Sequence, residues 1–195
     1  MSTATESNSP ARGPVLTAGI ALAAMAVLSP IGLLVGLPEG CFGLAALTVL
    51  IVAALDVVVA CALLPVMARG GGLLARCAAG ARLAYAAGFA VAAGFLVAPV
   101  DVARFHAIWD AALLLFGVHL ALAAVALWRG GVVPPWIAAL VGVAGLGYIA
   151  DAVLIVLGTH PTVSVGAFTF IGELVLTLWL ISRGIRPARR RGLVW

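Results

Sequence analysis

The sequence has very little charge, because Asp, Glu, Lys and Arg together make up only 9% of its 195 residues. A soluble domain usually has about 25% charged residues, which keep its surface in water. The hydrophobic share is 65%, whereas about 45–50% is usual for a soluble domain. The two deviations exclude an ordinary soluble protein and predict that lipid covers much of the surface.

Lysine is absent, so every basic residue is an arginine, a bias that accompanies GC-rich coding and hints at a bacterial source. The three cysteines (Cys41, Cys61 and Cys77) lack metal-ligand or redox spacing and are interpreted as small buried hydrophobic residues. The HExxH, GxSxG and Walker patterns are also missing. We therefore expect no metal ion, no cofactor and no nucleic-acid partner.

Long apolar runs recur along the chain, and we expect six of them to cross a membrane as helices. Each approaches or exceeds the roughly 20 residues that span a bilayer at about 1.5 Å rise per residue. They do not alternate apolar and polar residues as barrel strands do, so the expected fold is an all-α, polytopic membrane helix bundle. The expected spans are residues 14–36, 41–67, 80–98, 106–128, 135–157 and 163–183.

The two ends of the chain are expected to lie outside this six-helix domain of residues 14–185. Residues 1–13 are polar and lack periodicity, which indicates a disordered cytoplasmic tail. Residues 186–195 form a basic cytoplasmic tail, whose arginines are expected to bind anionic lipid head groups at about 1 kcal/mol each. These arginines are Arg186, Arg189, Arg190 and Arg191. A topology or retention signal is the alternative role for them.

The placement of arginine orients the spans, because cytoplasmic loops of membrane proteins are enriched in basic residues. With the N-terminus in the cytoplasm, ten of the eleven arginines, including Arg82, are assigned to the cytoplasmic side and only Arg104 to the outer side. Six spans return the C-terminus to the cytoplasm. A multi-pass protein of the cell membrane is the resulting interpretation.

Some residues of the spans are expected to shape the bundle. Pro30 lies inside the first span and is expected to kink it. Gly32 with Gly36, and Ala138 with Gly142, are pairs of small residues four apart, which allow close approach of two membrane helices.

A few ionisable or polar side chains interrupt the apolar runs, and they are the candidate functional residues. A charged group costs about 2.5–3.5 kcal/mol at the centre of a membrane helix. Such residues therefore usually face the bundle interior and mark a function. The expected intramembrane polar cluster consists of Asp56, Asp110, His119, Tyr148, Asp151, Thr169 and Glu173. Few basic residues are expected at that depth, so acidic side chains that find no cation there would be protonated.

Helical spacing groups several of these residues. Thr169, Glu173 and Thr177 are four residues apart and form a polar stripe on one face. Tyr148 and Asp151 share a face, so the tyrosine hydroxyl could approach the carboxylate.

Two histidines, His106 and His119, lie on the same expected span as Asp110. His106 and Asp110 are also four apart, but an interfacial helix start explains this pair better than a metal site. His119 is nine residues from Asp110, so it points to the opposite side of the same helix.

The segment of residues 109–185 resembles the DUF4386 family of bacterial integral membrane proteins. That family typically has a glycine- and arginine-bearing turn, then P-x-x-x-G-x-L-x-x-x-G-x-G-Y-x-x-D, then E-x-x-x-x-x-W-L-x-x-x-G. The matching residues are Pro135, Gly142 (offset from the family spacing), Gly145, Gly147, Tyr148, Asp151, Glu173, Trp179, Leu180 and Gly184. The resemblance implies a bundle of several spans and implies no particular activity.

Three classes of function remain open. The first is binding or transport of a proton, a cation or a small amphipathic molecule through an acidic cavity, with Glu173 and Asp151 as a titrating pair. The second is structural: small-residue faces dock another copy or a partner helix, and the buried acids secure packing. The third is an enzyme acting on a lipid-like substrate, in which His119 with Asp56 or Glu173 serves as acid–base pair or metal ligand.

Overall fold

The computed structural model describes residues 12–159, residue 165 and residues 171–185. Within these residues the chain is helical and contains no strand. The helices are α1 (Arg12–Pro30), α2 (Phe42–Met67), α3 (Gly72–Gly94), α4 (Val102–Arg129), α5 (Pro135–Val156) and α7 (Ile171–Ile185), with a π-helical segment η1 (Ile31–Gly36) and a 3-10 turn η2 (Ala68–Gly70). The prediction of an all-α membrane helix bundle is confirmed.

Five helical stretches of the described residues are long and apolar enough to cross a membrane. They are Arg12–Gly36, Phe42–Gly70, Gly72–Gly94, Val102–Arg129 and Pro135–Val156. The protein is therefore a multi-pass membrane protein. Of the expected sixth span, residues 163–183, the N-terminal third lies mostly outside the described residues, and α7 covers the C-terminal two thirds.

The observed helix boundaries differ from the expected spans at several places, including the start of α4 at Val102 where residue 106 was expected. Arg12 and Gly13, which were expected in the N-terminal tail, begin α1, and residues 1–11 lie outside the described part. The third helix begins at Gly72, well before the expected start at residue 80, and ends at Gly94. The glycine run at residues 70–72 separates α2 from α3. Arg76 and Arg82 therefore lie within α3, and not in the connection before it. Hydropathy alone therefore places the start of this helix too far along the chain, because the two arginines lower the hydropathy of its first part.

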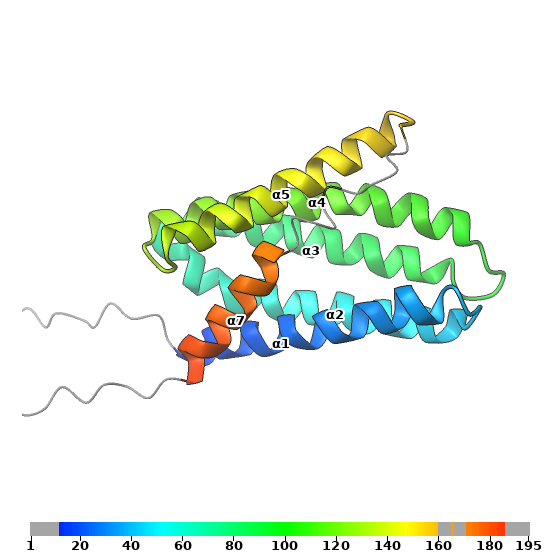
Figure 1. Cartoon of the computed structure of the whole chain (residues 1–195), viewed down its shortest axis with the longest axis horizontal. Coiled ribbons are helices and arrows are strands. Elements are labelled where there is room, and N and C mark those ends of the chain that lie inside the picture. The colour runs from blue at the N-terminus through cyan, green and yellow to red at the C-terminus, as the bar shows by residue number, and fades with distance from the viewer. Residues whose placement is uncertain (1–11, 160–164, 166–170, 186–195) are drawn as a thin grey trace, which may run out of the picture.

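The contacts between the helices close into a ring around a common interior. Each of α1 to α5 packs against the next helix in the sequence, and α7 packs against both α5 and α1. Figure 1 shows α7 inclined to the other helices, near the end of the bundle where α1 and α5 begin. The first described residue of α1 and the last of α7 lie at that same end.

Small residues set the distance between α4 and α5. A Cβ atom added to Gly117 would lie 2.7 Å from the carbonyl oxygen of Gly145, and one added to Gly145 would lie 2.7 Å from the nitrogen of Ala121. The two backbones are therefore in direct contact at this crossing. The expected pair of Ala138 and Gly142 is less closely packed, because a Cβ on Gly142 would meet only Ala124 at an ordinary 3.5 Å.

The kink expected at Pro30 takes the form of a change of helix type. α1 ends at Pro30, and the next six residues, Ile31–Gly36, continue as a π-helix. Proline cannot donate the backbone hydrogen bond of a regular turn, so a wider turn at this place is physically reasonable. Gly32 lies against Thr48 of α2 there and leaves no room for a side chain.

Candidate functional site

A buried ion pair lies in the centre of the ring. The guanidinium Nη2 of Arg82 on α3 is 2.5 Å from Oδ1 of Asp56 on α2, and the side chains are only 2% and 0% exposed. The arginine count places Arg82 on the cytoplasmic side, and this prediction is wrong because the side chain is buried in the bundle. It lies ten residues into α3, or about 15 Å along the axis, which is the middle of the helix. The expectation that few cations reach the depth of the acids is also wrong for Asp56.

His119 on α4 completes this polar centre. Its Nε2 lies 3.0 Å from Nη1 of Arg82, and its Nδ1 lies 2.8 Å from the carbonyl oxygen of Ala78. Arginine can only donate and a carbonyl can only accept. Nε2 is therefore the acceptor and Nδ1–H the donor, so the imidazole is neutral. Because both ring nitrogens are engaged, His119 positions Arg82 and is not free to act as an acid–base group.

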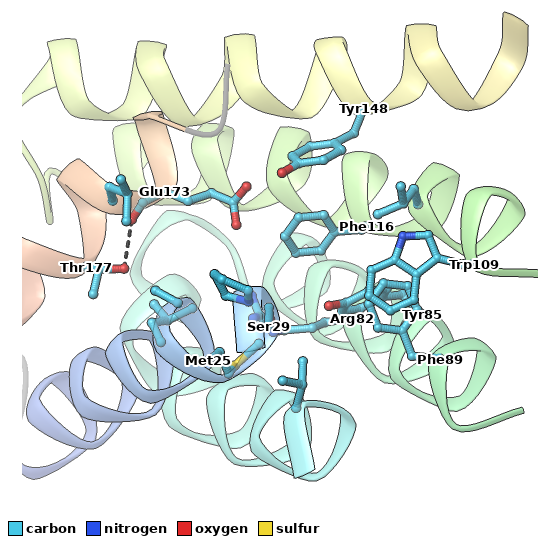
Figure 2. A pocket seen from close by; sticks show the side chains of 16 residues that line it. Met25, Ser29, Arg82, Tyr85, Phe89, Trp109, Phe116, Tyr148, Glu173 and Thr177 are labelled. Atoms are coloured by element: carbon cyan, nitrogen blue, oxygen red, sulfur yellow. Dashed lines mark hydrogen bonds between the residues drawn. The ribbon is translucent and has the colours of Figure 1, made fainter. Parts of the chain in front are cut away.

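A cavity of about 290 Å³ lies next to this centre, inside the ring (Figure 2). Residues of α1, α2, α3, α4, α5 and α7 line it, so it lies within the closed ring of helices. Its lining includes Met25, Ser29, Arg82, Tyr85, Phe89, Trp109, Leu113, Phe116, Tyr148, Glu173 and Thr177. Asp56 and His119 are not in the lining and contact Arg82 from behind it.

Aromatic rings make up one side of the cavity. Phe89 and Trp109 stack with centroids 3.5 Å apart, and Tyr85 meets Phe89 edge-on at 4.4 Å. Phe116 lies between Tyr148, at a centroid distance of 5.1 Å, and the guanidinium of Arg82, which sits 5.7 Å from its ring. The wall is therefore apolar, rigid and rich in π-faces.

Glu173 supplies the acidic group of the cavity. It enters from the first turn of α7, and Figure 2 shows its carboxylate directed towards the hydroxyl of Tyr148. Its Oε1 is buried and has no hydrogen-bond partner among the described residues. Such an atom requires an explanation, because burying a polar group without a partner costs free energy. The expected polar stripe is only partly tested: Thr177 donates to the backbone oxygen of Glu173 at 2.8 Å, and Thr169 lies outside the described residues.

The remaining predicted site residues are placed elsewhere. Asp151 is buried but does not line the cavity, and its Oδ1 accepts the backbone N–H of Val165 at 3.0 Å. Asp110 is half-buried on α4, and His106 is exposed, so neither belongs to the cavity lining. Among the described residues, no group of three or more His, Cys, Asp or Glu side chains is arranged to hold a metal ion. Arg186, Arg189, Arg190 and Arg191 lie outside the described residues.

Sequence reasoning missed the residues that dominate the site. Arg82, Tyr85 and Phe89 are three and four residues apart and therefore share one face of α3. A helix that starts at the glycine pair Gly71 and Gly72 places Arg82 at its centre. The shared face of Arg82, Tyr85 and Phe89 can be recognised from the sequence only with this start. An aromatic residue in an apolar run carries no distinguishing pattern, so the sequence gives no reason to select Trp109 or Phe116 as site residues.

Comparison with known proteins agrees with the resemblance. Residues 102–184 match the family described as "Domain of unknown function (DUF4386)". The chain is 36% identical over 84 residues to an uncharacterized protein of Archaeoglobus fulgidus. The aligned region covers 43% of this chain and 51% of that relative. The chain thus spans about half the length of the curated relative that it matches. No solved structure gives a significant match. The predicted similarity to this family is confirmed for α4, α5 and α7, which contribute Trp109, Phe116, Tyr148 and Glu173 to the cavity.

Proposed function

We propose that this multi-pass membrane protein binds a small amphipathic molecule in the cavity between Glu173 and Arg82. The observation that carries the proposal is the buried Oε1 of Glu173, which has no hydrogen-bond partner among the described residues and faces an aromatic-lined cavity. A bound molecule with one polar group would supply the missing partner and cover the apolar wall. Apolar pockets with a few convergent polar groups are the usual form of small-molecule sites.

The size of the cavity limits the ligand. Small-molecule pockets usually measure about 300–1,000 Å³, and this one, at about 290 Å³, is at the low end of that range. One aromatic ring with a short polar or charged substituent is the size of ligand that we expect. A whole membrane lipid would fit only if most of it remained outside the cavity.

The position of the cavity suggests how a ligand would reach it. Ser29, Phe89, Trp109 and Tyr148 lie nearer to the bundle end that carries the connections at residues 37–41 and 95–101 than to the other end. The opposite end carries most of the arginines of the described residues, which supports a cytoplasmic placement there. We therefore propose entry from the outer side of a cell membrane, with both termini in the cytoplasm and the basic tail on anionic lipid.

A pair of tryptophan substitutions on α4 tests the proposal. Leu113 lines the cavity, whereas Leu115 is 39% exposed on the outer surface of the bundle. Leu113→Trp would fill the cavity, and Leu115→Trp makes the same chemical change towards lipid. The protein in lipid nanodiscs would be screened by thermal unfolding against neutral, cationic and anionic aromatic amphiphiles.

At least one class of these compounds is expected to raise the Tm of the wild type and of Leu115→Trp, and not that of Leu113→Trp. If no compound of any charge class shifts the Tm, or if both variants respond alike, the cavity is not a binding site.

A further inference from the structure

We propose that the ligand of this cavity is an organic cation, and that it binds by displacing a proton from Glu173. This inference rests on the proposed function and names the class of ligand. It follows from the charges that surround the cavity and from the chemistry of its walls.

The first step is a charge count of the polar centre. The charges of Asp56 and Arg82 offset each other in their buried ion pair, and His119 is neutral because both of its nitrogens are engaged. Glu173 therefore has no cation of its own. An isolated carboxylate is costly within a membrane, so it requires either a proton or a bound cation. The two would occupy the same carboxylate and exclude each other.

The groups that face Glu173 support this reading. They are Tyr148 on α5, Arg82 on α3 and, at longer range, Asp56 on α2 and the phenol of Tyr85 on α3. The cavity residues contributed by α1 and α4 are uncharged. Tyr148 can donate one hydrogen bond to the carboxylate, but a phenol brings no positive charge. The charge of an ionised Glu173 is therefore left for a ligand to balance.

The walls are suited to the same class of ligand. An ammonium group near the face of an aromatic ring is attracted by the ring quadrupole, and aromatic cages with a carboxylate are a common way to bind such groups. Phe116 already has a guanidinium, that of Arg82, 5.7 Å from its ring. Tyr148 presents a further ring beside Glu173, and Trp109 presents one farther along the cavity wall. An anion is less favoured, because it would lie beside Glu173 in the cavity, and the charge of Arg82 is already offset by Asp56 behind it.

The test uses three probes of similar shape with the full-length protein in lipid nanodiscs. Benzyltrimethylammonium has a permanent positive charge, neopentylbenzene replaces its nitrogen by carbon, and tert-butylbenzoate is an anion. Isothermal titration calorimetry in buffers of different ionisation enthalpy measures affinity and the number of protons released. Because the cationic probe cannot itself titrate, any released proton comes from the protein.

The cation is expected to bind at least about 30-fold more tightly than either other probe, as a desolvated cation–π contact implies. It should release about one proton wherever free Glu173 is protonated. Since the proton and the cation compete, affinity should then rise with pH, by up to about tenfold per unit. Glu173→Gln should abolish both cation binding and proton release. Glu39→Gln, the same change at an exposed turn, should alter neither.

Glu173→Asp covers the case in which Glu173→Gln does not fold, because it keeps the carboxylate and should retain proton release. Four results would each overturn this inference. They are equal binding of neopentylbenzene, tighter binding of tert-butylbenzoate, cation binding without proton release, and no cation binding. The wider proposal of a binding cavity would then still be judged separately, by the response of Leu113→Trp and Leu115→Trp to the full panel.

Discussion

Nη2 of Arg82 lies 2.5 Å from Oδ1 of Asp56 in the interior of the bundle, where both side chains are almost fully buried. Arg82 also contacts His119, so this one guanidinium connects α2, α3 and α4. A buried ion pair does not necessarily stabilise a protein more than apolar residues would, but removal of one partner leaves the other charge uncompensated. The first prediction follows from that asymmetry.

Arg82→Met is expected to lower the free energy of unfolding by about 3–5 kcal/mol, because it leaves the Asp56 carboxylate buried without a cation. Adding Asp56→Asn should recover part of the loss, since the uncompensated charge is then removed. Denaturant unfolding in detergent micelles measures both. Arg104→Met is the control: its ion pair with Asp101 is exposed, at 70% for Arg104, and should contribute less than about 1 kcal/mol. A loss for Arg82→Met as small as that of the control would contradict the buried pair.

His119 is expected to be a neutral imidazole with its proton on Nδ1, because Nε2 accepts from Arg82 and Nδ1 donates to Ala78. Nitrogen NMR of histidine-labelled protein distinguishes this tautomer from the Nε2–H form. The exposed His106 provides an internal reference in the same sample. A doubly protonated ring or an Nε2–H tautomer at His119 would contradict the hydrogen bond that Nε2 accepts from Arg82.

Gly145→Ala is expected to destabilise the bundle by about 1–3 kcal/mol, as overpacking of a tight contact does. The added Cβ would lie 2.7 Å from backbone atoms of α4, which cannot move aside as a flexible side chain could. Gly80→Ala is the matched control, because nothing lies within 4 Å of its added Cβ and alanine favours helix. Thermal unfolding of the two variants measures the difference. Equal stability would mean that α4 and α5 are not in close contact there.

The free thiol of Cys41 is expected to react with a membrane-impermeant maleimide on intact cells, because it is exposed beside the turn at residues 37–41, on the proposed outer side. In a Cys41→Ser background, a cysteine introduced at Leu73, which is 69% exposed at the opposite end of the bundle, should react only after the cells are opened. All three cysteines are exposed, so their interpretation as buried residues is wrong, and Cys61 and Cys77 are replaced by serine throughout. The reverse pattern of labelling would invert the proposed topology.

Part of the candidate site could be recognised from the sequence, and part could not. Asp56, His119, Tyr148 and Glu173 attracted attention because polar groups in an apolar span are costly, and the structure places all four at or next to the cavity. Asp110 and Asp151 satisfied the same criterion, yet neither lines the cavity. The free-energy cost of a polar group in lipid shows that its side chain must be shielded from the acyl chains. It does not show whether the cavity or a contact elsewhere in the bundle shields it.

Arg82 illustrates the opposite error. A long arginine near a span boundary can extend to the membrane surface, so its distance from the end of the helix decides its role. That distance depends on whether the helix begins at Gly72 or near residue 80. The ends of helices are the part of a structure that a sequence predicts least accurately.

The sequence alone determined that this protein lies in a membrane as a bundle of helices, because the scarcity of charge and the length of the apolar runs leave the backbone no other way to satisfy its hydrogen bonds in lipid. It also singled out the acids within the spans, of which Asp56 and Asp151 are buried and Asp110 and Glu173 are half-buried. Only the tertiary structure decided the partners: Arg82 with Asp56, Glu173 facing Tyr148, and Asp151 with a backbone N–H outside the cavity. Such pairings depend on which helices become neighbours and how each is rotated, and α7 closes the ring between α5 and α1 through contacts far apart in the chain.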